Sequence, residues 1–176
     1  MQNDQLKQLI DTSSRIILKV GSSLLINENN NDINYQWLKK FSKEIQSLTD
    51  KKKQIMIVSS GSVALGRKQL NLVKNLSLDE KQAAAAVGQI HLSHAWKEVL
   101  KSFKLESAQI LLAPDDTETR RKHLNARATL LKLLQLNVIP VINENDTVST
   151  DEIKFGDNDR LCLLYTSDAA DDVYCV

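Results

Sequence analysis

A lysine next to a glycine–serine turn forms the first candidate site of chemistry. Lys19 lies in an apolar, β-branched run at 15–20, and Gly21 and Ser22 follow it. Small residues at such a turn let backbone N–H groups approach an anion, and lysine adds positive charge. The pattern predicts a phosphate or carboxylate site. The alternative is a strand-end lysine that reaches solvent or pairs structurally with Asp159.

The segment VINENDTVSTDEIKFGDNDRL, at 141–161, is the second candidate. It places acidic and amide side chains directly behind a predicted buried strand, in greater number than a tight turn requires. A solvated loop is the plain alternative, because Asn, Asp, Gly and Ser are ordinary turn formers. A ligand pocket lined by these side chains is the functional interpretation.

Familiar nucleotide and metal motifs do not account for these residues. The dinucleotide fingerprint G-x-G-x-x-G does not occur, and GSVALGRK at 61–68 has Arg-Lys where a P-loop requires Lys-Ser or Lys-Thr. Cys162 and Cys175 have no zinc-like spacing, and neither do the three histidines. The sequence therefore predicts no metal site.

Composition limits the class of protein. The 176 residues carry a net charge of +1, so no broad field attracts nucleic acid or a membrane surface. The N-terminus lacks a basic region followed by an apolar core, and no segment approaches the length of a membrane span. We expect a cytoplasmic protein with one globular unit.

Strands and helices alternate along the chain. Apolar runs predict strands and three- to four-residue spacings predict helices. The alanine-rich helix at 78–103 indicates close packing against a neighbour rather than a reactive surface. The predicted strands are 15–20, 55–58, 107–113 and 138–143, and the predicted helices are 35–48, 78–103 and 120–136.

This alternation predicts an α/β fold, with a mostly parallel sheet sandwiched by helices. Ligands of such sheets bind where loops leave the carboxyl ends of the strands. The turns at 21–23 and 59–61 and the loop at 143–146 should therefore share one rim. The polar segment at 141–161 then faces a common pocket.

Six segments in this order resemble the amino acid kinase family. The resemblance covers 15–161, and "VINENDTV" followed by "FGDND" is its most specific part. It implies the amino acid kinase fold and ATP-dependent phosphorylation of a carboxylate, that of the L-glutamate side chain, as in the first step of proline synthesis. The segments are KVGSS, IVSSGSVALGR, AAVGQ, LNARATL, VIPVINENDTVST and IKFGDNDRL.

The resemblance also implies residue roles. Lys19 would contact the transferring phosphate of ATP, which is used with Mg²⁺, and the amides of Gly21 and Ser22 would cradle it. Asp159 would orient the catalytic lysines. The residues that would bind glutamate are Ser60, Asp146 and Asn158. Asp146 suits an ammonium group, while amides and hydroxyls bond either charge of a zwitterion.

The resemblance further implies proline as a feedback inhibitor and a homo-oligomer at full length, with no nucleic-acid or membrane partner. Residues 1–14 are interpreted as an N-terminal extension and 15–161 as the N-terminal portion of the kinase domain. The acidic, cysteine-bearing tail 162–176 is interpreted as foreign sequence. The ATP-binding C-terminal portion of the family fold is missing, so this chain alone is expected to be inactive.

Two alternatives remain open. One is a non-catalytic module that senses glutamate or proline. The other is a kinase of the same fold that acts on a different acceptor, such as aspartate, acetylglutamate or a nucleoside monophosphate. The acidic segment argues against the nucleotide, because clustered carboxylates repel a second phosphate.

Overall fold

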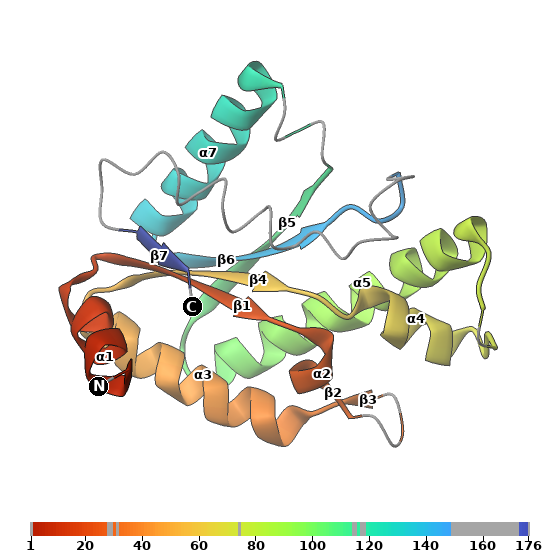
Figure 1. Cartoon of the computed structure of the whole chain (residues 1–176), viewed down its shortest axis with the longest axis horizontal. Coiled ribbons are helices and arrows are strands. Elements are labelled where there is room, and N and C mark those ends of the chain that lie inside the picture. The colour runs from red at the N-terminus through yellow and green to blue at the C-terminus, as the bar shows by residue number, and fades with distance from the viewer. Residues whose placement is uncertain are drawn as a thin grey trace.

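The protein is described by a computed structural model that covers residues 2–27, 30, 32–73, 75–113, 116, 119–148 and 173–175. Parallel strands form its centre, and helices lie on both faces (Figure 1). The elements of the first 69 residues are α1 (Gln2–Thr12), β1 (Arg15–Val20), α2 (Ser22–Leu25), β2 (Ile26–Asn27), β3 (Asp32–Ile33), α3 (Tyr35–Asp50), β4 (Gln54–Ser59) and α4 (Ser62–Gln69). Those that follow are α5 (Leu78–Ser102), β5 (Glu106–Leu112), α7 (Arg120–Gln135), β6 (Val138–Glu144) and β7 (Val173–Cys175).

The main sheet has the strand order β5-β6-β4-β1-β7, and every neighbouring pair is parallel. β1 and β4 pair along their whole length, from Arg15 opposite Gln54 to Val20 opposite Ser59. The two strands therefore end at the same level. This confirms the predicted parallel α/β fold and places the first two polar turns on one rim.

Pro140 lies inside β6 and removes one backbone donor, yet the strand is intact. The β4–β6 pairing begins at Val141, one residue beyond the proline, while Pro140 is opposite Ala108 of β5. The missing N–H thus falls outside the described β4–β6 register.

The sheet has two hydrophobic cores, one on each face. The larger core packs α3 and α5 against one face and includes Ile16, Ile57 and Trp96. The smaller core packs α7 against the other face and includes Ile17, Val58 and Leu130. Successive strand residues alternate between the cores, as the two-residue period of a strand requires.

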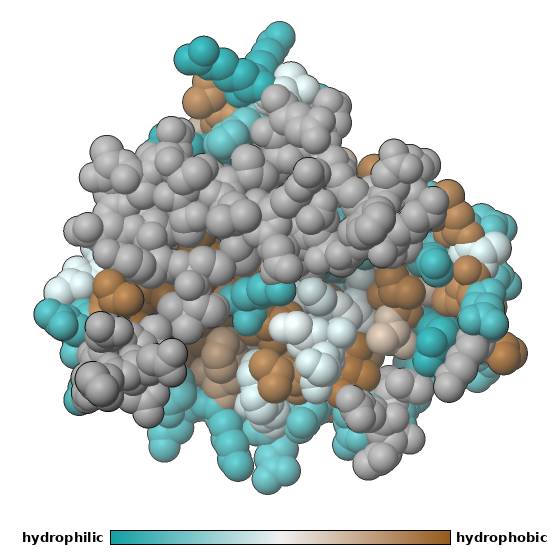
Figure 2. Space-filling view, viewed as in Figure 1, coloured by the Kyte–Doolittle hydropathy of each residue, from teal (hydrophilic) through white to brown (hydrophobic). Residues whose placement is uncertain are grey.

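Capping residues fix where the long helices begin. The Asn34 side chain accepts a hydrogen bond from Trp37 N at 3.1 Å at the start of α3. Ser77 and Glu80 form a reciprocal capping box at the start of α5. Figure 2 shows hydrophilic side chains along the margin where α3 lies, consistent with an outward polar face.

The predicted helices and longer strands are confirmed to within one or two residues at their ends. The sequence patterns did not predict α1, the short β2–β3 hairpin or β7, and the helix α2 begins inside the turn expected at 21–23. β7 lies within 162–176, the segment interpreted as foreign, and it pairs with β1. None of the described helices has the combined length and apolarity that a membrane crossing needs.

Helices α4 and α5 touch backbone to backbone. A Cβ added at Gly66 of α4 would lie 1.7 Å from the carbonyl oxygen of Ala84, and one at Gly88 of α5 would lie 1.8 Å from the carbonyl oxygen of Ser62. Neither obstacle is a flexible side chain, so only glycine fits at either position. The predicted close packing of the alanine-rich helix is therefore confirmed.

This contact predicts that Gly88→Ala destabilises the protein. Alanine normally stabilises a helix interior by about 1 kcal/mol relative to glycine, but here it forces two backbones apart. We expect a loss of about 1–3 kcal/mol in the free energy of unfolding, measured by urea denaturation. Ala83→Gly, at an exposed position of the same helix, gives the propensity effect alone. A Gly88→Ala protein as stable as the parent contradicts the backbone contact.

Candidate functional site

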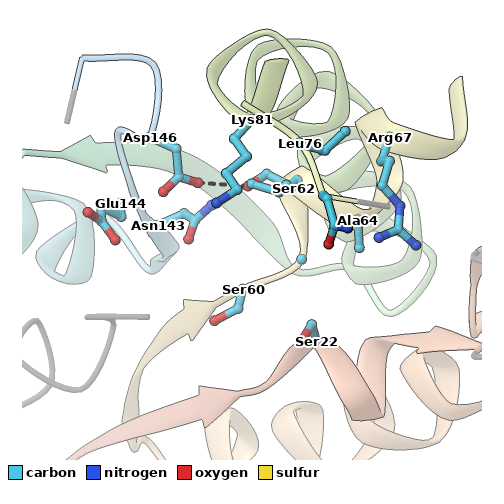
Figure 3. Close-up of a pocket in the computed structure, with 13 residues that line it drawn as sticks. Ser22, Ser60, Ser62, Ala64, Arg67, Leu76, Lys81, Asn143, Glu144 and Asp146 are labelled. Carbon is cyan, nitrogen blue, oxygen red and sulfur yellow. Dashed lines mark hydrogen bonds between the residues drawn. The ribbon is translucent and has the colours of Figure 1, made fainter. Parts of the chain in front are cut away.

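A cavity of about 510 Å³ opens where β4 and β6 end and α4 begins (Figure 3). It occupies the rim at which ligands of parallel α/β sheets bind. Most of the residues that line it carry polar or charged side chains, although apolar atoms also form part of the wall. The lining residues are Ser22, Ser60, Gly61, Ser62, Val63, Ala64, Arg67, Asn75, Leu76, Lys81, Asn143, Glu144 and Asp146.

The turn between β4 and α4 needs a glycine. Gly61 has φ +120°, and a Cβ there would also lie 3.0 Å from Ile26 Cδ1. Ser60 N donates to Val20 O at 3.0 Å, which joins this turn to the end of β1. The turn brings the first residues of α4, from Ser62 to Ala64, to the cavity wall. Amide groups in a first helical turn have no partner within the helix, so this side of the cavity suits an anion.

A chain of hydrogen bonds fixes the opposite side of the cavity. Asn143 Nδ2 donates to Gln89 Oε1 at 2.7 Å and to Ser62 Oγ at 3.4 Å. Because Ser62 accepts from Asn143, its own hydroxyl proton is directed to Asp146 Oδ2, at 3.0 Å. Residues from α5, β6, α4 and the loop after β6 are thereby held in one arrangement.

Burial raises the pKa of the Asp146 carboxyl above its ordinary value, and the hydrogen bond from Ser62 partly opposes that shift. No cation contributes to the shift. A carboxylate that is desolvated and not offset by a protein cation gains most from a bound ligand cation. Asp146 therefore suits an ammonium group.

Two cations also line the cavity. Lys81 extends into it from α5, whereas Arg67 projects from the last turn of α4 and lies on the side away from Asp146 (Figure 3). The cavity therefore presents amide N–H groups and cations as well as carboxylates. Such a wall can bind a small molecule that carries both signs of charge.

The structure brings together three of the predicted site residues. Ser22, Ser60 and Asp146 line the same cavity, and Gly21 immediately precedes Ser22. Lys19 is exposed near the end of β1 and is not part of the cavity wall. Lys19 is two positions after Ile17 in the strand, so its side chain lies on the same face of the sheet, which α7 covers.

Asn158 and Asp159 lie outside the described residues. Their predicted contacts with glutamate and with the catalytic lysines stay predictions.

The sequence reading missed Lys81, Arg67 and the role of Ser62. It interpreted α5 as a packing helix rather than a reactive surface, and that interpretation was incomplete, since α5 supplies Lys81 and Gln89. One signal was available for Lys81. The Ser77–Glu80 capping box marks the start of a helix, and a lysine close behind it is disfavoured by the helix dipole.

A second cavity of about 360 Å³ adjoins the first between α5 and the ends of β5 and β6. The two cavities share Ser62, Glu144 and Asp146. Glu144 is only 7% exposed, so a second buried carboxyl group stands beside Asp146 at the boundary between the cavities. The acidic part of the wall is therefore broader than Asp146 alone.

Known proteins are similar to this chain in sequence. The glutamate 5-kinase of Paramagnetospirillum magneticum is 50% identical over 149 residues, 85% of this chain and 40% of the relative's length. The glutamate 5-kinases of Rhodopseudomonas palustris and Gluconobacter oxydans are 50% identical over 160 and 166 residues, covering 43% and 44% of their lengths. The chain thus spans about two fifths of the length of the curated relatives it matches.

Solved structures share the fold. UMP kinase from Bacillus anthracis has a TM-score of 0.52 at 20% identity, covering 73% of this chain and 52% of its own. Isopentenyl phosphate kinase from T. acidophilum has a TM-score of 0.51 at 12% identity, over 73% of this chain and 54% of its own. The model of the amino acid kinase family matches residues 14–167. By that match, this chain belongs to the amino acid kinase family.

Proposed function

We propose that the chain is part of a glutamate 5-kinase, which transfers the γ-phosphoryl group of ATP to the side-chain carboxylate of L-glutamate. The product is L-glutamyl 5-phosphate, an acyl phosphate, and this is the first step of proline synthesis. The proposal is supported by 50% identity to relatives of that name over most of the chain.

The structural observation that carries the proposal is a cavity whose wall contains both positively and negatively charged groups. Glutamate has one ammonium and two carboxylate groups, and the cavity wall combines Asp146 with amide groups of α4 and cationic side chains. Ser60 can hydrogen-bond either charge. We assign Ser60 and Asp146 to glutamate binding, together with Asn158, whose assignment is carried by the family resemblance.

The end of β1 fits a phosphate group. Gly21 has φ −72°, which any residue adopts, and a Cβ there would meet only Ser23 Oγ at 3.8 Å. Neither backbone conformation nor packing requires glycine at this position, so its small size leaves room for a ligand against the main chain. We assign Gly21, Ser22 and Lys19 to the phosphates of ATP, which binds as its Mg²⁺ complex.

The chemical step needs positioning rather than a covalent enzyme intermediate. An oxygen of the glutamate side-chain carboxylate attacks the γ-phosphorus, the bond from that phosphorus to the bridging oxygen breaks, and ADP departs with the electron pair. Two anions must be brought into line, so positive charge between them lowers the barrier. Lys19 supplies that charge in this proposal, and Asp159 orients it.

A cytoplasmic location, feedback by proline and self-association at full length belong to the same proposal. Self-association has some structural support, since β5 lies at one end of the described sheet. An open strand edge favours pairing with another chain.

The first prediction from the proposed function concerns the reaction. The full-length protein, incubated with glutamate, Mg²⁺ and ATP, should form an acyl phosphate that hydroxylamine converts to a coloured hydroxamate. Aspartate, acetylglutamate and UMP, tested as competing acceptors, should give little product. Absence of hydroxamate with glutamate, or preference for another acceptor, contradicts the proposal. Glutamate binding in calorimetry without turnover indicates a sensing module instead.

The second prediction concerns Lys19. Lys19→Met should lower kcat by about a hundred- to a thousandfold, the usual cost of removing one preorganised charge from a transition state. KM for glutamate should change little, because Lys19 lies outside the cavity wall. Lys43→Met, which removes an equal charge from the exposed face of α3, is the control. Equal activity of the two variants refutes the role of Lys19.

The third prediction concerns Asp146 and pH. Its pKa is raised in the ligand-free protein, so the folded state holds the proton more tightly than the unfolded state. The stability contributed by this group therefore falls as pH rises from the unfolded to the folded pKa, and stays low above that window. Asp146→Asn should raise the thermal stability of the ligand-free protein at neutral pH, yet weaken glutamate binding about ten- to a hundredfold.

Thermal melts and calorimetry of both proteins from pH 4 to pH 8 measure these effects. The stability difference should shrink toward acid pH. The parent should lose more glutamate affinity than Asp146→Asn as pH falls through the raised pKa, because protonation of the glutamate side chain affects both proteins equally. A variant that binds glutamate normally removes Asp146 from the site.

A further inference from the structure

The proposed substrate carries one charge more than the assigned residues neutralise. The side-chain carboxylate of glutamate must face the phosphate donor at the end of β1, and Asp146 takes the ammonium group. The α-carboxylate still needs a partner. Ser60, Asp146 and Asn158 include no cation.

Lys81 is placed to supply that charge. It is half-buried in the cavity wall, and its side chain extends from α5 into the cavity (Figure 3). No ion pair joins it to Asp146 within 4.0 Å, and it makes no other ion pair with the described residues. A cation and an anion that share a cavity without touching leave space for a ligand between them.

The dipole of α5 does not favour a lysine at position 81. It stands four residues after the cap Ser77, near the positive end of the α5 dipole, where a cation is unfavourable. The neighbouring Glu80 bonds Ser77 in the capping box and is not engaged by Lys81. The helix dipole therefore gives no reason for a lysine at this position, whereas an anionic ligand in the cavity gives one.

Arg67 is the competing cation, and its position has another explanation. It lies in the last turn of α4, where a cation complements the negative end of the helix dipole. It also lies on the side of the cavity away from Asp146 (Figure 3). The ammonium and the α-carboxylate of an amino acid are attached to one carbon, so their partners must stand near each other.

We propose that Lys81 binds the α-carboxylate of the acceptor amino acid while Asp146 binds its ammonium group. This assignment rests on the proposed function and makes Lys81 a determinant of specificity for α-amino acids. Backbone N–H groups in the first turn of α4 also donate hydrogen bonds to this α-carboxylate. Lys81 contributes to ground state and transition state alike, because the α-carboxylate takes no part in the reaction.

The test compares Lys81→Met with Lys81→Arg and with Lys97→Met in the full-length protein. Lys97 is exposed on the same helix, so its variant is a matched loss of charge. Lys81→Met should raise KM and the dissociation constant for glutamate about ten- to a hundredfold, with kcat at saturating glutamate and the melting temperature retained. Lys81→Arg should restore most of the affinity, and Lys97→Met should match the parent.

A substrate analogue separates binding from general structural damage. 4-Aminobutyrate keeps the amino group and the reacting carboxylate of glutamate but lacks the α-carboxylate. Its inhibition constant against glutamate should be the same for the parent and for Lys81→Met. An equal loss for glutamate and for the analogue, or unchanged glutamate binding by Lys81→Met, overturns the assignment. A parent that forms no acyl phosphate from glutamate overturns the proposed function itself.

Discussion

The cavity depends on two helices that meet backbone to backbone. Gly66 and Gly88 let α4 and α5 approach until the carbonyl oxygen of Ser62 occupies the space that a side chain at position 88 would fill. Ser62 is also the first residue of α4 and the donor to Asp146. The contact between Gly88 and Ser62 thus fixes the position of the first turn of α4, with its backbone N–H groups, and of the hydroxyl that bonds Asp146. A wider helix spacing would separate these two sides.

The charged groups in the cavity lower the stability of the folded protein. Asp146 is desolvated, Glu144 is buried beside it, and Lys81 stands at the unfavourable end of a helix. Each would be more stable in water or at another position. A zwitterionic ligand offsets these costs together, because its ammonium and carboxylate groups complement charges that the protein keeps apart. Strain of this kind is common where binding, rather than stability, sets the residue.

The fold was predictable from the sequence to a large extent, because it follows from local patterns. Short, β-branched runs such as 15–20 and 138–143 favour buried strands, and the parallel connection of those strands then places the turns on one rim. Asp146 and Ser60 were predictable as site residues for the same reason. Lys81 was not, because its role depends on which face of α5 meets β6. The packing of α5 is set in part by contacts that a local pattern does not reveal, between Gly66 and Ala84 and between Gly88 and Ser62.

The alanine run and the polar site are two parts of one arrangement. Ala84 and Ala85 of α5 are buried, and the backbone of Ala84 lies against Gly66 of α4. Further along the same helix, Gln89 accepts a hydrogen bond from Asn143 of β6 at 2.7 Å. Lys81 lies two helical turns earlier than Gln89 and so projects over the same rim. The helix whose alanines indicate packing is therefore also the one that places polar groups around the cavity.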